Sequence, residues 1–174
     1  MDLLSLKIPL DFIESRLGEL TWRDVQFGLE NELLDPAAVP GVAAAALDQR
    51  DPPAGVLELA IAEPGDPVLD EVSRLGQAEP PARFPSERKW LYLVLAWLYE
   101  RRAELANPLE TVEIVYAEFG YPTSITGFVR YMPADEPIPP TLELAEARLM
   151  ERWAGFLAEE RRTLADGAAG ELNG

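Results

Sequence analysis

The sequence predicts an all-α protein, and three observations support this fold class. Apolar residues recur at three- and four-residue steps along most of the 174 residues. Capping residues followed by proline, or by an acidic residue three positions later, mark several helix starts. Strand-like alternation is scarce, and residues 126–132 form the one run where an extended segment competes with a turn of helix. We expect a single-domain helical bundle, or a short solenoid-like stack, of about seven helices.

The first two helices are predicted at residues 9–18 and 21–34. Gly18 is a plausible C-terminal stop for the first helix because glycine tolerates the left-handed backbone that ends many helices. Thr21 is the expected N-cap of the second helix, and Asp24 lies three residues later, as in an acidic variant of the capping box.

Three short helices are predicted next, within residues 35–50, 54–62 and 66–76. In the first, Asp35 and Pro36 form a cap-then-proline pair, but Pro40-Gly41 is expected to interrupt the helix until Val42. In the third, Asp66 and Pro67 repeat the cap-then-proline signature.

Residues 86–105 form the clearest helical segment, with Ser86 as its expected N-cap. Apolar side chains cover nearly every face of it, so this helix is expected to be central and buried. The segment 107–120 is well punctuated by Asn107 as cap, Pro108 at the first helical position and Gly120 at the end.

A final helix is predicted at residues 141–164, after proline-rich loops at 77–85 and 133–140. We expect one all-helical domain over residues 1–164 and a flexible C-terminal tail over residues 165–174. The sequence contains neither a fixed repeat period nor a segment typical of a domain linker.

Composition limits the classes of function. The net charge of -16, from 31 acidic and 15 basic residues, disfavours nucleic-acid and anionic-membrane partners and favours a cationic one. The absence of cysteine and histidine excludes disulfides, Cys/His zinc sites, thiol nucleophiles and His-based triads. With no recognisable signal peptide and no long apolar run, we expect a cytoplasmic protein without a membrane partner or a cofactor.

The acidic residues concentrate in one part of the chain. Between Asp24 and Ser73 there are eleven acidic residues and one basic residue, Arg50. Solvated helix faces would explain this pattern, and so would a continuous acidic face that binds a cationic partner.

No recognised catalytic motif is present, so no catalytic residue is assigned. The loop residues Glu63, Asp66 and Asp70, with Glu71 beside them, superficially resemble hard-cation ligands. However, Asp66 is expected to cap a helix, and Asp70 and Glu71 fall in its first turns, where acidic residues complement the helix dipole. No metal site is therefore assigned.

Aromatic residues gather between Val115 and Pro133. Tyr116 and Phe119 share a helix face and are expected to pack inward. Tyr121 precedes Pro122 and is expected to be extended. Packing within the core or a turn explains the cluster, whereas Tyr121 and Tyr131 could instead face a partner.

Two segments carry a resemblance to a known family. Lys89-Trp90 opens the hydrophobic helix, Tyr116-Ala117-Glu118-Phe119 leads to Tyr121-Pro122, and Tyr131-Met132-Pro133 closes the second segment. Over about residues 84–133 the chain resembles the bacterial domain of unknown function 2247 family. The resemblance implies a small cytosolic bacterial protein and supplies no catalytic residues. Acidic families without catalytic motifs include immunity proteins, which suggests toxin neutralisation by analogy.

The favoured hypothesis is a non-enzymatic, acidic protein-binding module. An immunity or antitoxin protein of this kind would mask the active or substrate-binding surface of a cationic toxin domain. A monomer or weak homodimer is expected. The alternatives are a divalent-metal carboxylate enzyme centred on Glu63, Asp66 and Asp70, and a self-associating structural protein. The expected partner-binding residues are Glu58, Glu63, Asp66, Asp70, Glu71, Tyr121 and Tyr131.

Overall fold

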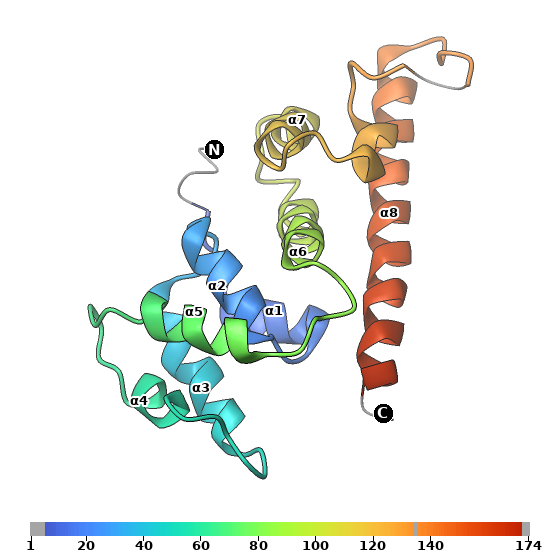
Figure 1. The fold of residues 1–174 in the computed structure, drawn as a ribbon. Coiled ribbons are helices and arrows are strands. Elements are labelled where there is room, and N and C mark those ends of the chain that lie inside the picture. Colours follow the sequence, from blue (N-terminus) through green and yellow to red (C-terminus); the bar gives the residue numbers. More distant parts are fainter. Residues whose placement is uncertain (1–5, 134–135, 172–174) are drawn as a thin grey trace. The chain divides into compact units, whose positions relative to one another are not determined.

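The computed structural model describes residues 6–133 and 136–171, and it confirms the all-α prediction, because no strand occurs among these residues. Figure 1 shows the helices in chain order. They are α1 (Leu10–Leu17), α2 (Trp22–Glu30), the 3-10 helix η2 (Pro36–Ala38), α3 (Val39–Leu47), α4 (Val56–Ala60), α5 (Leu69–Ala78), α6 (Ser86–Glu100), α7 (Pro108–Glu118), the 3-10 helix η3 (Thr123–Phe128) and α8 (Leu142–Glu171).

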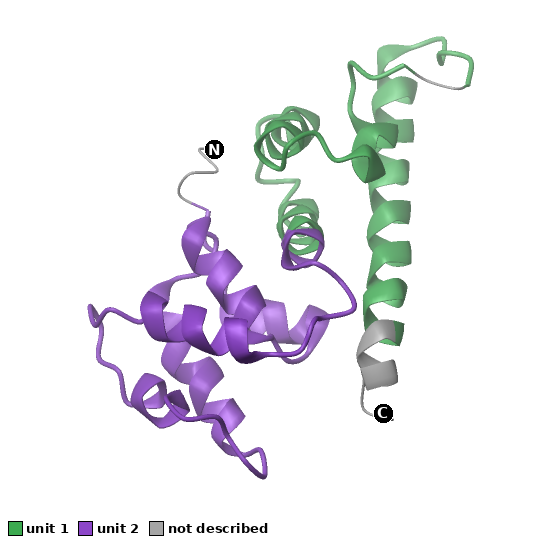
Figure 2. Ribbon diagram, in the orientation of Figure 1, with its two compact units in different colours: residues 1, 91–174 green, residues 2–90 purple. Residues whose placement is uncertain are grey.

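The chain divides into two compact units, shown in Figure 2. Unit 2 comprises residues 2–90, and unit 1 comprises residues 91–174 together with residue 1. The division falls inside α6, after Trp90.

Unit 2 is built around the close approach of α2 and α5. A Cβ atom added to Gly76 of α5 would lie 3.3 Å from the backbone nitrogen of Arg23 on α2, so the small residue permits this contact. The side chains of Val25 and Val72, one from each helix, are fully buried. A segment before α1 is also tied to the unit, since Ile8 donates its backbone N–H to Leu33 O at 2.8 Å.

Unit 1 has an aromatic core between η3 and α8. Trp153 of α8 is fully buried, and its ring stacks on Phe128 of η3 with ring centroids 6.3 Å apart and nearly parallel planes. The ring of Tyr99 forms a T-shaped pair with the same indole, with ring centroids 5.1 Å apart. Such rings bury large apolar areas, and their burial holds α8 next to η3.

Several helix starts are confirmed. Thr21 and Asp24 form a reciprocal capping box at α2. Asn107 caps α7 by accepting the N–H of Glu110 at 3.2 Å, with Pro108 in the first turn. These local signals are read correctly from sequence because both partners lie within four residues of each other.

Three predicted boundaries are wrong. Pro40 and Gly41 lie inside α3, because Pro40 occupies the first turn, where its missing N–H costs no helical hydrogen bond. Asp66 does not cap α5, whose N-cap is Val68; its carboxylate instead accepts the N–H of Glu63 at 2.8 Å and closes the preceding turn. Ser86, predicted as the N-cap that precedes the helix, is instead the first residue of α6.

Two further predictions have a definite outcome. The segment 126–132 is not a strand, since Thr126 to Phe128 belong to the 3-10 helix η3. Helix α8 continues past Leu164 to Glu171, because no proline interrupts residues 165–171. Residues 172–174 lie outside the described part of the chain.

Candidate functional site

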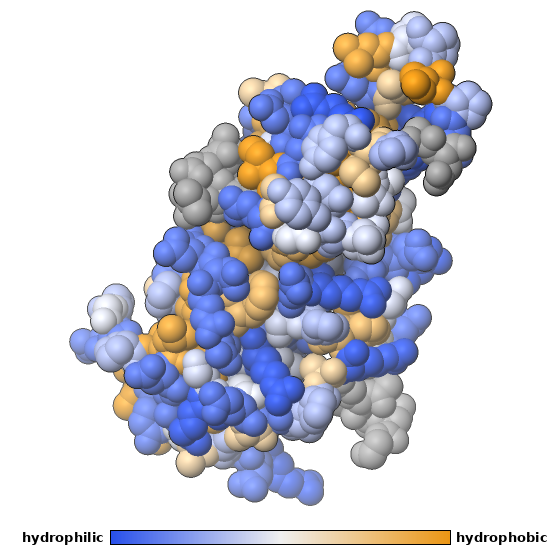
Figure 3. All heavy atoms as spheres, turned by 45° about the horizontal axis from the view of Figure 1, so that its top comes forward, coloured by the Kyte–Doolittle hydropathy of each residue, from blue (hydrophilic) through white to orange (hydrophobic). Residues whose placement is uncertain are grey.

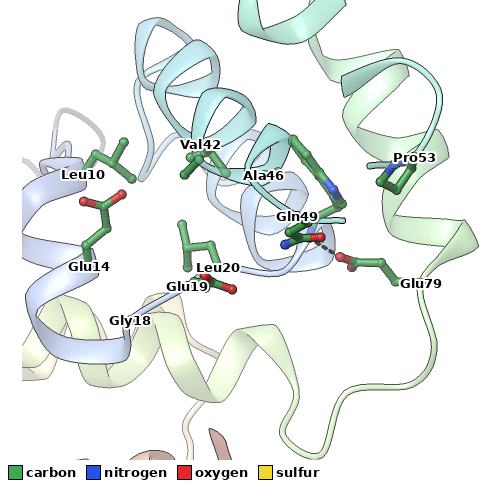
Figure 4. A pocket seen from close by; sticks show the side chains of 12 residues that line it. Leu10, Glu14, Gly18, Glu19, Leu20, Val42, Ala46, Gln49, Pro53 and Glu79 are labelled. Atoms are coloured by element: carbon green, nitrogen blue, oxygen red, sulfur yellow. Dashed lines mark hydrogen bonds between the residues drawn. The ribbon is translucent and has the colours of Figure 1, made fainter. Parts of the chain in front are cut away.

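A pocket lies within unit 2, between α1, α3 and the start of α2. Its volume is about 390 Å³ (Figure 4). Volumes of roughly 300–1,000 Å³ are typical of small-molecule sites, so a side chain or small ligand would fit.

Local backbone geometry forms the pocket. Gly18 ends α1 with a φ of 73°, in the left-handed region that glycine tolerates. The chain then turns through Glu19 and Leu20 to the N-cap Thr21. This turn places the end of α1 and the first residue of α2, Trp22, around the same space.

The interior of the pocket is apolar. Trp22 and Val42 are buried at its wall, and Leu10, Leu20 and Ala46 are half-buried there. In Figure 4, Val42 and Leu20 lie between Glu14 at one end of the view and Glu79 at the other. The pocket therefore offers hydrophobic contact along its length and carboxylates at its ends.

Three glutamates supply the charge of the pocket. Glu14 and Glu19 are exposed, whereas Glu79 is half-buried. None of the described residues that line the pocket is a lysine or arginine. A bound cation would consequently meet acidic groups that have no basic neighbour within the lining itself.

Glu79 also holds the start of α2. Its two carboxylate oxygens accept the backbone N–H groups of Trp22 at 2.8 Å and Arg23 at 3.2 Å. Burial is the main cause that raises the pKa of Glu79 above its ordinary value, while these two hydrogen bonds and the charge of Arg23 act in the opposite direction. The carboxylate is thus held in position at the start of α2.

A buried ionic network is centred on Asp24, which is also a member of the capping box. Asp24, 1% exposed, accepts from Thr21 N at 3.1 Å, Ser86 Oγ at 2.7 Å and Lys89 Nζ at 2.8 Å. The indole N–H of Trp90 donates to the backbone oxygen of Asp24 at 2.8 Å. One member of the acidic stretch is therefore a structural residue of the interior.

The acidic residues predicted to bind a partner fall into two groups. Glu58, Glu63, Asp66 and Asp70 are exposed. Glu71 is half-buried and pairs with Arg74 at 2.5 Å, and this hydrogen bond lowers the pKa of Glu71. Among the described residues, no group of three or more acidic side chains could hold a metal ion. The metal alternative gains no geometric support.

The tyrosines Tyr121 and Tyr131 are 61% and 59% exposed and flank the buried Tyr116. The ring of Tyr121 meets the ring of Tyr116 edge-on at 5.2 Å, and that of Tyr131 lies at 6.1 Å. The cluster is therefore part core and part surface. Burial raises the pKa of the Tyr131 hydroxyl, and the neighbouring Tyr116, Tyr121 and Glu113 add to this shift.

The extended conformation predicted for Tyr121 is wrong. Its φ is 62°, in the left-handed region, directly after Gly120 at 69°. Its N–H donates to Tyr116 O at 2.8 Å, while Gly120 N donates to Ala117 O at 3.2 Å. These two bonds form the pattern of a Schellman motif, which outweighs the preference set by Pro122.

Basic residues of unit 2 are engaged by the unit itself. Lys7 donates to Glu32 O at 2.5 Å. Arg23 donates to Gly76 O and Glu79 O, both at 2.8 Å. Arg74 donates to Ala54 O as well as to Glu71. These three side chains therefore donate mostly to backbone carbonyls, and only Arg74 among them also donates to a carboxylate.

The pocket residues were not identified from the sequence. Gly18 and the Thr21 capping box predicted the turn beside Glu19, which is a local signal for one wall. Glu79 had no such signal, since it lies 57 residues from Trp22, the residue whose N–H it accepts.

Comparison with known proteins gives the family. Residues 10–161 match the family model of an uncharacterised protein conserved in bacteria (DUF2247), so the chain belongs to this family. The resemblance seen over residues 84–133 is thereby confirmed. No curated protein and no solved structure gives a significant match. No helix among the described residues has both the length and the apolar character needed to cross a membrane.

Proposed function

We propose that this member of the DUF2247 family acts by binding and not by catalysis, and that unit 2 presents an acidic surface to a cationic protein partner. In its specific form, the proposal is a cytoplasmic immunity or antitoxin protein that masks the active or substrate-binding surface of a toxin domain. Tyr121 and Tyr131 of unit 1 would supply aromatic anchors, since tyrosine is favoured at interface hot spots.

The exposed acidic residues of unit 2 carry the proposal. Of the eleven acidic residues between Asp24 and Ser73, only Asp24 is buried and only Glu71 is half-buried. The remaining nine acidic residues are exposed: Glu30, Glu32, Asp35, Asp48, Asp51, Glu58, Glu63, Asp66 and Asp70. Hydrophilic residues cover most of the face drawn in Figure 3.

Such a surface has a predictable effect on association. Complementary charge speeds the encounter of two proteins at low salt and disfavours partners of the same sign. The interactions between exposed charges are screened over a Debye length of about 8 Å at physiological ionic strength. Binding should therefore weaken as salt is added.

The first experiment is to co-purify the full chain with the product of the neighbouring gene and to measure the affinity at low and high salt. Co-expression should also restore growth if that product is toxic. An affinity that is equal at both ionic strengths would reject the electrostatic mechanism. A neighbour that neither binds nor harms the cell would contradict the toxin-neutralising form.

A pair of charge-matched variants tests where the partner binds. Glu58→Gln/Glu63→Gln/Asp70→Asn removes three exposed charges from unit 2, and we expect at least a tenfold loss of affinity. Glu143→Gln/Glu151→Gln/Glu159→Gln removes three exposed charges from α8 and should change affinity less than about twofold. Equal losses in both variants would assign the effect to net charge alone.

Self-association is the second candidate function, and one observation favours it. Ile138, Leu142 and Leu144 are 85%, 73% and 53% exposed at and before the start of α8. Light scattering of the full chain separates the two functions, because a structural protein would form stable oligomers and an immunity protein would remain monomeric or weakly dimeric without its partner.

A further inference from the structure

We propose that the pocket between α1, α3 and the start of α2 receives a basic side chain, lysine or arginine, that projects from the partner protein. This inference rests on the proposed function, because it supplies the specific contact that an acidic surface alone would lack. It also adds a binding site in a part of unit 2 that the sequence did not single out.

The shape and polarity of the pocket match an amphipathic cation. Lysine and arginine carry three- or four-carbon apolar stems that pack along hydrophobic surface while the charged end reaches polar groups. Here Trp22, Val42 and Leu20 provide the hydrophobic surface, and Glu14 and Glu19 are exposed at the edge. An anion would be repelled, and a purely apolar group would leave the carboxylates without a new partner.

Glu79 makes the pocket more than a patch of exposed acids. It is half-buried and held by two backbone N–H groups of α2, so its carboxylate has a set orientation at the pocket wall. Arg23 beside it is turned to the carbonyl oxygens of Gly76 and Glu79, at 2.8 Å each, and not into the lining. A cation that enters the pocket would place a positive charge within the lining, which contains no lysine or arginine.

The test uses the full chain and three defined probes: the peptide acetyl-Gly-Arg-Gly-amide, its norleucine analogue, and free spermidine. Binding is followed by the NMR amide shifts of Gly18 and the side-chain amide of Gln49, both at the pocket. We expect saturable shifts with the arginine peptide and at least fivefold weaker binding of the norleucine peptide.

Two variants and one control locate the binding. Glu14→Gln/Glu19→Gln should weaken the arginine peptide at least fivefold, and Ala46→Phe should abolish its shifts by filling the pocket at unchanged charge. Glu58→Gln/Glu63→Gln removes the same charge elsewhere in unit 2 and should leave the peptide affinity within twofold. Amide spectra of each variant establish that it folds.

The results that overturn the inference are distinct. Equal or tighter binding of the norleucine peptide would make this a neutral apolar site. Tighter binding of spermidine than of the peptide would make it a small-amine site and not a docking site. If partner binding is lost in the Glu58→Gln/Glu63→Gln/Asp70→Asn variant but kept in Glu14→Gln/Glu19→Gln, the proposed function stands and the pocket inference fails.

Discussion

At the scale of single residues, Gly28 shows how one missing side chain sets the packing of unit 2. A Cβ atom at this position would lie 2.3 Å from a ring carbon of Trp90, whose indole is fully buried. The indole also donates to Asp24 O, so it cannot easily withdraw. Gly28→Ala should therefore cost about 1–3 kcal/mol by overpacking, measured by chemical denaturation.

Gly155 provides the matched control for this substitution. It lies within α8 and is exposed, and a Cβ atom there meets no other atom within 4 Å. Gly155→Ala should be neutral or stabilise by up to about 1 kcal/mol, because alanine is the better helix former. Equal effects of the two substitutions would show that Trp90 does not occupy the space beside Gly28.

Tyr121 has a strained backbone conformation, which a comparison of its glycine and alanine variants can reveal. Its φ of 62° is unfavourable for any residue with a Cβ atom, by about 1–2 kcal/mol. Tyr121→Gly and Tyr121→Ala both remove the ring contact with Tyr116, but only alanine keeps the strain. The glycine variant should be the more stable of the two by about 1 kcal/mol, in thermal or chemical unfolding. A more stable alanine variant would argue against the left-handed geometry.

Glu79 and Glu71 should affect stability with opposite dependence on pH. The folded-state pKa of Glu79 is raised by burial, so its contribution is present below the ordinary value of 4.5 and is lost as pH rises above it. The pKa of Glu71 is lowered by Arg74, so its contribution is present above 4.5 and is lost as pH falls below it.

The measurement is the free energy of unfolding of the wild type minus that of each glutamine variant, over a pH series. For Glu79→Gln, this difference should decrease as the pH rises above 4.5. For Glu71→Gln, it should decrease as the pH falls below 4.5. Curves of the same sign for both variants would contradict the assigned environments.

At the scale of helices, the pair Asp24–Lys89 links α2 to the first turns of α6. The side chains are 1% and 16% exposed, and the carboxylate also accepts from Thr21 N and Ser86 Oγ. Removal of one partner from a buried pair typically costs about 3–5 kcal/mol, because the other charge is left without compensation. Asp24→Asn should approach this cost.

A double-mutant cycle isolates the pair. Asp24→Asn/Lys89→Met, which preserves net charge, should be less destabilised than the sum of the single variants by more than about 1 kcal/mol. The more exposed pair Glu113–Arg130, at 2.6 Å, is the comparison, and its coupling should stay below about 1 kcal/mol. Additive effects at Asp24 and Lys89 would mean that the ion pair is not formed in solution.

The helices also show which features the sequence could predict. Thr21–Asp24 and Asn107–Pro108 were predicted correctly because each cap and its partner are close in sequence. Asp66–Pro67 gives the same local signal, yet the carboxylate serves the preceding turn, since Val68 and not Asp66 is the N-cap of α5. Local patterns thus predicted the presence of a helix more reliably than the position of its first residue.

The candidate site could not be predicted in the same way. Its walls combine α1, α3 and Glu79, and no periodic pattern relates residues so far apart. The sequence left open whether Tyr121 and Tyr131 pack within the protein or face a partner. Both are exposed but contact the buried Tyr116, so the cluster belongs to both core and surface. The acidic excess was evident from composition, but the burial of Asp24 was not.

At the scale of the whole chain, two compact units are joined through one continuous helix. No glycine- or proline-rich linker marks this division, because it falls between Trp90 and Leu91 inside the helix α6. The expectation of one all-helical domain over residues 1–164 remains a prediction. A continuous helix can therefore connect two packing units without a compositional signal.

The net charge of -16 predicts a stability that rises with salt. Like charges on a folded chain repel one another. The Debye length falls from about 30 Å at 0.01 M to about 10 Å at 0.1 M, so this repulsion is screened, while the buried Asp24–Lys89 pair is screened much less. The thermal midpoint should rise by a few degrees over this range. We expect a higher thermal midpoint at low salt, and a smaller rise with salt, in the variant Asp48→Asn/Asp51→Asn/Glu58→Gln/Glu63→Gln. An equal rise in this variant would indicate a general salt effect, and a fall in the wild type would mean that its exposed carboxylates are already paired.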